Sequence, residues 1–216
     1  MNEYVAFLRA VNVAGHAIVR MNDLRAAFQR AGGRNVRTVI QSGNVLFEAS
    51  AGEAVRVVRK VRNGLGQMLG VNPEIILRRV DEINAILASA PFGDWQARDG
   101  VKLYVTFLAR DPKERPALPW VSSREALEVV RINGREAFVV SRRNRRGFFG
   151  FPNNFIEEKL GVPATTRNWP TVARIGNQAR AEADGGHRGH AGAPAGGASG
   201  ASVHARKAAA TRKGKR

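Results

Sequence analysis

Three short segments of this sequence carry polar side chains that could do chemistry. Residues 9–15 directly follow an expected strand, residues 41–44 read Gln-Ser-Gly-Asn and are typical of a tight turn, and residues 165–168 directly precede an expected helix. A helix start offers free backbone N–H groups and the positive end of the helix dipole, so arginine and asparagine placed there favour a phosphate or carboxylate. The candidate ligand-binding residues are Arg9, Asn12, Gln41, Ser42, Asn44, Thr166, Arg167 and Asn168.

The third segment also has a plainer interpretation, which its spacing alone favours. Asn168 is then the N-cap of the helix that follows, because an asparagine oxygen accepts a hydrogen bond from a free N–H of the first turn. Arg167 then faces solvent. The residue types by themselves leave both interpretations open.

Catalytic groups are scarce. The chain has no cysteine, and His16 is the only histidine before residue 185. Ser42 lacks the Gly-x-Ser-x-Gly spacing of a nucleophile elbow, so we interpret it as a turn residue whose hydroxyl bonds backbone or ligand. His187 and His190 are too few to form a metal site on a rigid scaffold, and we expect none. The sequence therefore identifies no catalytic residue and no cofactor, and it leaves open whether the protein is an enzyme.

A basic stretch with neighbouring aromatic residues, residues 142–151, offers a second functional hypothesis. Arginines hold phosphates and aromatic rings stack on bases, so the stretch is a candidate nucleic-acid-binding surface. Arg146-Gly147-Phe148 matches part of the RNA-recognition pattern, but Phe149 follows where that pattern has Gly or Ala. A solvated loop whose phenylalanines anchor in the core fits the sequence better. The candidate nucleic-acid residues are Arg142, Arg143, Arg145 and Arg146.

The net charge of +17 is spread unevenly. Residues 185–216 hold seven Lys and Arg and no Asp or Glu, which leaves residues 1–184 with 28 basic and 18 acidic side chains and a charge of +10. A basic surface attracts polyanions without regard to their sequence, but it also serves solubility. The Ala/Gly-rich end cannot bury enough apolar surface to offset its ordering entropy, so we expect a disordered basic tail. It is either a solvated extension without a role or a non-specific contact for nucleic acid.

Hydrophobic periodicity predicts an α+β protein made of two ferredoxin-like βαββαβ halves in tandem, the second less regular. In the first half, residues 4–8, 36–40, 45–47 and 75–77 read as strands, and residues 22–31 and 53–69 as helices. In the second half a Pro-rich connection replaces the first helix, and Asn154 with Glu157 resembles a capping box. The expected divisions are residues 1–80, residues 81–184 and residues 185–216. We also expect a cytoplasmic protein, because no signal peptide and no membrane-spanning run is visible.

Four blocks of sequence together resemble the bacterial domain-of-unknown-function family 1697. They are residues 9–15, residues 21–25, residues 36–47 and residues 165–172, and the resemblance spans about residues 2–178. In the third and fourth of these blocks, Val39 stands where the family usually has Tyr, and Pro170 where it often has Asn. The resemblance implies a two-part ferredoxin-like fold and no particular activity.

These observations lead to one main hypothesis and two alternatives. The polar segments converge into a cleft between the halves that binds a small anionic ligand, including phosphorylated ones. Arg9 and Arg167 hold the charge and the other candidates orient the ligand, so the first and third segments must lie within about 15 Å, the reach of two such side chains to one small ligand. The alternatives are a nucleic-acid-binding module that uses the basic body, residues 142–146 and the tail, and a protein-interaction domain.

Overall fold

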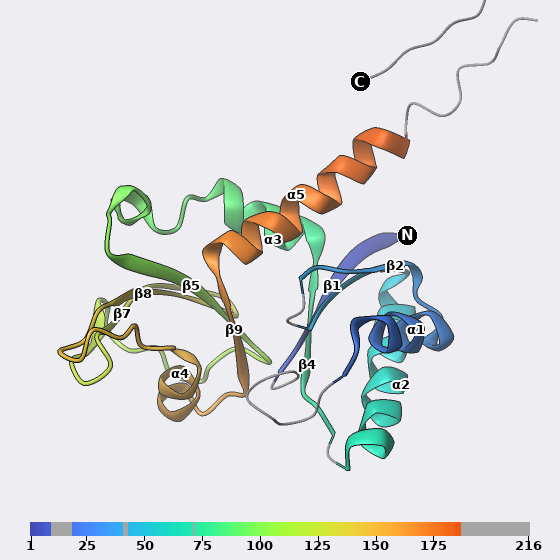
Figure 1. Ribbon diagram of the computed structural model, residues 1–216, viewed down its shortest axis with the longest axis horizontal. Coiled ribbons are helices and arrows are strands. Elements are labelled where there is room, and N and C mark those ends of the chain that lie inside the picture. Colours follow the sequence, from blue (N-terminus) through green and yellow to red (C-terminus); the bar gives the residue numbers. More distant parts are fainter. Residues whose placement is uncertain (10–18, 41–42, 71, 187–216) are drawn as a thin grey trace, which may run out of the picture.

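The computed structural model describes residues 1–9, 19–40, 43–70 and 72–186, of which 180–186 are described by their backbone alone. These residues form two antiparallel sheets and five α-helices, so the protein is of the mixed α+β class, as predicted (Figure 1). Within these ranges no helix combines the length and the apolar character needed to cross a membrane. The expected tail lies outside the described residues from residue 187 onward.

The first half of the chain forms a four-stranded sheet with two helices on one face. Its elements are β1 (Asn2–Leu8), α1 (Met21–Ala31), β2 (Arg34–Thr38), β3 (Asn44–Ala49), α2 (Ala51–Leu69) and β4 (Ile75–Arg79). The strands lie in the order β2-β3-β1-β4, and all neighbours are antiparallel. α1 ends at Gly32, whose φ of 106° is a left-handed conformation that glycine adopts without strain.

The second half has the same strand order with an added edge strand. Its elements are α3 (Val80–Ala88), the 3-10 helix η1 (Gly93–Ala97), β5 (Val101–Leu108), β6 (Trp120–Ser122), β7 (Leu127–Asn133), β8 (Glu136–Arg142), α4 (Asn153–Leu160), β9 (Ala164–Asn168) and α5 (Trp169–Gly186). The strands lie in the order β6-β7-β8-β5-β9. The connection from β5 to β7, which is described throughout, carries β6 and no helix.

The two sheets pack face to face, and the alternation along each central strand decides which layer a side chain joins. On β1, Val5 and Phe7 belong to the core between the sheets, whereas Tyr4 and Leu8 belong to the core under α1 and α2. Phe107 on β5 lies opposite Phe7, and the two rings stack with centroids 4.2 Å apart. Burial of one such side chain contributes about 1.5–3 kcal/mol, so this pair anchors the two halves to each other.

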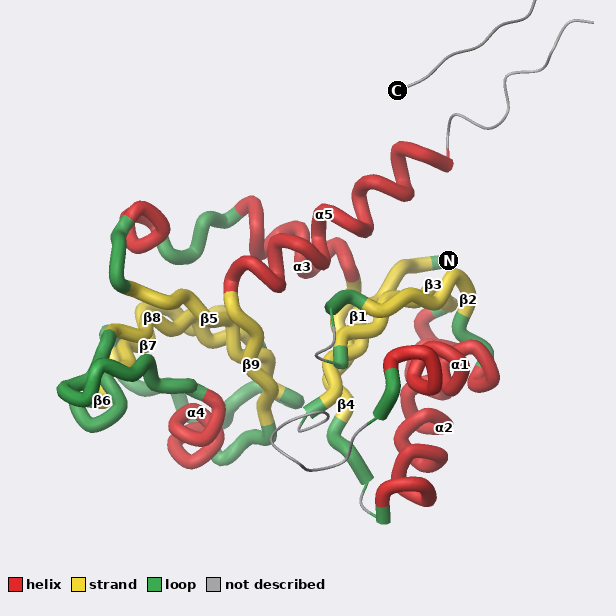
Figure 2. Tube along the Cα trace, viewed as in Figure 1, coloured by secondary structure: helices red, strands yellow, loops and turns green. Residues whose placement is uncertain are grey.

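The helices α3 and α5 lie side by side across one end of the sheet pair (Figures 1 and 2). Each follows the last strand of its own sheet without a loop, and each adds apolar residues to the core between the sheets. Gly176 on α5 makes this close approach possible, because a Cβ there would lie 2.4 Å from Leu87 Cδ1 of α3.

The start of α4 differs from the sequence prediction. Pro152 is the residue before the helix, and no side chain caps it. The capping box expected from Asn154 and Glu157 is therefore wrong. Glu157 instead accepts a hydrogen bond from the N–H of Ala164 at 2.6 Å, so its carboxylate ties α4 to the start of β9.

Candidate functional site

Arg167 extends from β9 of the second half into the first half. Its Nη2 donates to the carbonyl oxygen of Leu8 at 3.0 Å, and its Nε donates to Asn44 Oδ1 at 2.5 Å. Its Nη1 donates to Thr165 Oγ1 at 2.8 Å and to the carbonyl oxygen of Thr166 at 2.9 Å. The side chain is thereby held by both sheets. The interpretation in which Arg167 faces solvent is wrong, since the residue is only 9% exposed.

The charge of Arg167 has no carboxylate partner among the described residues. All four of its acceptors are neutral oxygens, and its guanidinium also lies over the ring of Phe7 at 5.4 Å. Burial lowers the pKa of Arg167 to about 10, because removal of water disfavours the charged form. At neutral pH the group still carries its proton. The junction between the sheets therefore contains a positive charge that no described anion neutralises.

Arg78 on β4 occupies the equivalent position in the other half. Val5 is its register partner on β1, as Val105 on β5 is the partner of Arg167. Its Nη2 donates to the carbonyl oxygen of Leu108 at 2.8 Å, and this bond mirrors the one from Arg167 to the first half. The two arginines thus cross between the sheets in opposite directions.

The two arginines differ in the residue that accepts from Nε. Arg78 Nε donates to Glu136 Oε1 at 2.6 Å, whereas Arg167 Nε donates to Asn44. Glu136 opens β8 opposite Phe107, as Asn44 opens β3 opposite Phe7, so these positions also correspond. Burial lowers the pKa of Arg78 as well, but Glu136 opposes this shift. One arginine is neutralised by a carboxylate, and its counterpart is not neutralised by any residue that the structure describes.

Arg9 connects the end of β1 to the second half. Its Nη2 donates to Glu157 Oε2 at 2.7 Å, while its backbone N–H donates to the carbonyl oxygen of Glu74 at 2.9 Å. The side chain is 40% exposed, and its Nε is a buried atom without a hydrogen-bond partner in the described part of the chain. Because Leu8 precedes Arg9 and accepts from Arg167, Arg9, the described residue of the first polar segment, lies close to the third segment at this junction.

The remaining candidates fall into two groups. Thr166 points to the opposite face of β9 from Arg167, where its hydroxyl bonds Thr106 Oγ1 at 2.9 Å and Asn153 Oδ1 at 3.3 Å. Asn168 Oδ1 accepts from the N–H of Thr171 at 2.9 Å, as the N-cap interpretation expects. Neither side chain faces the junction. Three further candidates lie outside the described residues, namely Asn12, Gln41 and Ser42.

The sequence was compared with models of known protein families. Residues 1–138 match the family model described as a protein of unknown function, DUF1697. The chain belongs to the DUF1697 family. The match contains the first two polar segments and ends before the third, so it is shorter than the span of residues 2–178 expected from the resemblance.

This DUF1697 protein also has a structural neighbour. It is similar to the solved structure of a conserved bacterial protein from Streptococcus pneumoniae, with a TM-score of 0.54 and 22% sequence identity. The alignment covers 82% of this chain and 97% of that chain, so the likeness extends through both halves. At this identity the likeness concerns the fold alone. No match was found among curated proteins.

The basic stretch of this DUF1697 protein separates into two pairs of arginines. Arg142 pairs with Glu128, and Arg143 donates to the carbonyl oxygen of Gly147 at 2.8 Å, so both are held by protein acceptors. The other two arginines line a pocket. The residues lining it are Ser123, Arg124, Asn144, Arg145 and Arg146.

Sequence reasoning missed Arg78 and Glu136, which complete the arrangement at the junction. The predicted fourth strand stops at Leu77, yet the strand alternation that buries Ile76 continues to Arg78, which is 1% exposed. A charged residue on the buried face of a strand is itself a signal of a paired or functional group. The partner Glu136 had no such signal, because it lies 58 residues away in the chain.

Proposed function

We propose that this protein binds a small anionic ligand at the junction of its two halves, beside Arg9, Asn44 and Arg167. The observation that carries the proposal is the contrast between the two equivalent buried arginines. Arg78 has the carboxylate of Glu136, and Arg167 has only neutral acceptors in the described part of the chain. A phosphate or carboxylate of a ligand is the group that would restore the balance.

The energetics support an anion at this place. Taking a guanidinium out of water costs several kcal/mol, and neutral hydrogen bonds offset only part of that cost. A unit negative charge at roughly 6 Å, with an effective dielectric constant of about 20, is attracted by about 3 kcal/mol. That attraction corresponds to more than a hundredfold in affinity, so Arg167 would contribute to binding even without touching the ligand.

Direct contact falls to side chains with free donors. Arg167 uses four of its five N–H groups on protein oxygens, whereas Arg9 is partly exposed and has an unbonded Nε. In the proposed site Arg9 contacts the ligand directly, and the positive charge of Arg167 attracts the ligand without touching it. Thr166 and Asn168 drop out of the direct set, since their side chains are used elsewhere. The chain neighbours Asn12, Gln41 and Ser42 remain in the proposed set, as orienting groups.

The two halves also suggest why the site lies where it does. We interpret them as tandem ferredoxin-like units, because each contains a sheet with its strands in the order second, third, first and fourth. Their inner faces meet along a pseudo-two-fold arrangement, with Arg78 and Arg167 as counterparts. Replacement of a carboxylate by Asn44 on one side only would convert a structural ion pair into a binding site.

The decisive experiment exchanges the acceptors of the two arginines. Asn44→Asp places an internal carboxylate against Arg167, and we expect it to abolish binding of phosphorylated and carboxylate metabolites, measured by calorimetry or thermal shift. Asn44 Nδ2 also donates to the carbonyl oxygen of Val39 at 3.1 Å, a bond that aspartate loses. The stability of the variant is therefore measured separately from its affinity.

Glu136→Gln is the matched control. It removes a carboxylate from the equivalent position on the far arginine, so we expect it to lower stability and leave ligand affinity within about twofold. Asn44→Asp binding with wild-type affinity would refute the proposal. A ligand screen in which wild-type protein binds no phosphorylated or carboxylate compound would refute it as well.

A further inference from the structure

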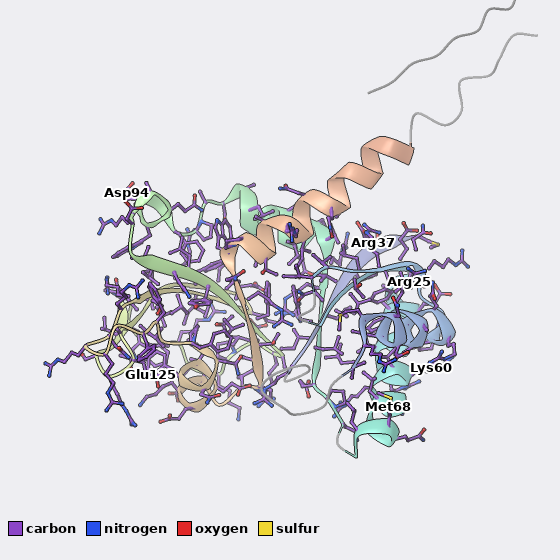
Figure 3. All side chains as sticks on the ribbon, viewed as in Figure 1. Arg25, Arg37, Lys60, Met68, Asp94 and Glu125 are labelled. Atoms are coloured by element: carbon purple, nitrogen blue, oxygen red, sulfur yellow. The ribbon has the colours of Figure 1, made fainter. Side chains whose placement is uncertain are left out.

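A basic pocket lies on the outer edge of the second half, away from the junction of the sheets. Its volume is about 530 Å³, and the described residues that line it include three arginines and no carboxylate. In the described part of the chain, Arg124, Arg145 and Arg146 make no ion pair. Glu125, which follows Arg124 in the chain and is labelled in Figure 3, is not among the residues that line the pocket. The pocket therefore presents uncompensated positive charge to solvent.

A tight turn fixes the backbone that carries two of the pocket's arginines, Arg145 and Arg146. Asn144 Oδ1 accepts from the backbone N–H of Arg146 at 2.9 Å and from that of Phe148 at 3.1 Å. The Asn144 N–H donates to the carbonyl oxygen of Phe148 at 2.8 Å, and the Gly147 N–H donates back to Asn144 at 2.9 Å. The turn is thereby tied by four hydrogen bonds, and it carries two arginines of the pocket lining, Arg145 and Arg146, together with the aromatic residue Phe148.

That aromatic ring is unusually accessible. Phe148 is 69% exposed and Phe151 is 56% exposed, so the expectation that the phenylalanines of this stretch anchor in the core is wrong for both. Phe149, which lies between them, is used differently, because Lys102 Nζ lies 4.6 Å from its ring centroid. In the described part of the chain no ring contact and no cation–π contact involves Phe148, which follows Arg146 of the pocket by two residues.

We propose that this pocket and Phe148 form a binding surface for single-stranded nucleic acid. Arg124, Arg145 and Arg146 contact backbone phosphates, and the open face of Phe148 stacks on a base. With the arginines assigned to phosphates and Asn144 Oδ1 used within the turn, Ser123 is the main uncharged side chain left among the described lining residues to read base edges. The surface thus binds strands without strong sequence preference. It is distinct from the proposed small-anion site and does not depend on it.

The test uses the full chain and a fluorescein-labelled oligonucleotide of twelve thymidines or uridines, followed by fluorescence anisotropy. Arg145→Gln with Arg146→Gln removes two phosphate contacts. Each contact contributes a slope of about −0.7 to the dependence of log affinity on log salt. Between 50 and 200 mM salt the wild type should therefore lose about sevenfold more affinity than the double variant.

The matched control is Arg59→Gln with Arg62→Gln, which removes the same charge from the exposed face of α2 in the other half (Figure 1). The basic residues beyond residue 184 are present in every variant, so their contribution cancels. We expect the control to bind nearly as the wild type does. Equal losses in both double variants would overturn the proposal, and so would the absence of binding at low salt.

A second comparison separates nucleic acid from other polyanions. Phe148→Ala removes the stacking platform, and we expect it to weaken oligonucleotide binding about tenfold while heparin binding stays unchanged. Heparin carries the charge of a polyanion but no bases. If Phe148→Ala leaves oligonucleotide affinity at the wild-type value, the surface is a general polyanion site and the proposal is overturned. Circular dichroism on each variant checks that the fold is retained.

Discussion

Glu136→Gln is the change that tests the reasoning about the two buried arginines most directly. It leaves an oxygen where Arg78 Nε now donates at 2.6 Å, but it removes the negative charge. The arrangement then copies the one around Arg167, which uses the side-chain oxygen of Asn44. Three further acceptors of Arg78 stay in place, namely the carbonyl oxygens of Leu77, Leu108 and Arg135.

The expected change in the free energy of unfolding depends on the charge that is lost and on the hydrogen bond that is kept. Removal of one partner of a buried pair usually costs 3–5 kcal/mol, but Gln retains the hydrogen bond and the side chain of Glu136 is 15% exposed. We therefore expect a loss of about 2 kcal/mol in the free energy of unfolding. For a chain of this size that corresponds to a fall of roughly 4–8 °C in Tm.

The assay is urea denaturation followed by tryptophan fluorescence at neutral pH. Glu158→Gln on the exposed face of α4 is the control, since Glu158 makes no ion pair in the described part of the chain, and it should change stability by less than about 0.5 kcal/mol. Glu136→Ala should cost more than Glu136→Gln, because it leaves Arg78 Nε without an acceptor. A Glu136→Gln variant as stable as the Glu158→Gln control would refute the idea that Arg78 needs its carboxylate.

Two further predictions concern packing and pH. Gly176→Val should destabilise the protein by about 1–3 kcal/mol in urea denaturation, because a Cβ at this position overlaps Leu87. Gly64→Ala on α2 is the control, since a Cβ there has open space and should stabilise the protein by about 0.5–1 kcal/mol. Equal effects of the two substitutions would contradict the close approach of α3 and α5. Burial raises the pKa of Tyr104 above its ordinary value of 10.0. The folded protein then holds this proton more tightly than the unfolded chain, so stability is lost as the pH rises past about 10. Tyr104→Phe should reduce the loss measured between roughly pH 9 and pH 11, and an unchanged loss would contradict the assignment.

The sequence predicted the elements of the fold better than the roles of the side chains. Apolar periodicity and glycine or proline stops located the strands and helices of the first half, including the helix end at Gly32. The Pro-rich connection correctly indicated a missing helix in the second half. The predicted role of Glu157 was wrong, because a capping box is read from neighbouring residues alone. The partners that Glu157 has in the structure, Arg9 and Ala164, lie outside α4 and are brought to it by the tertiary fold.

In the candidate site, too, the sequence predicted which residues matter but not which partners they have. Residue types alone identified Arg167 and Asn44 as polar groups at element ends, because polar side chains at such positions need a partner or a ligand. Whether a charge is neutralised depends on which oxygen lies within about 3 Å of it, and the sheet packing brings residues 123 positions apart to that distance. The contrast between Glu136 beside Arg78 and Asn44 beside Arg167 was therefore settled only in the tertiary structure.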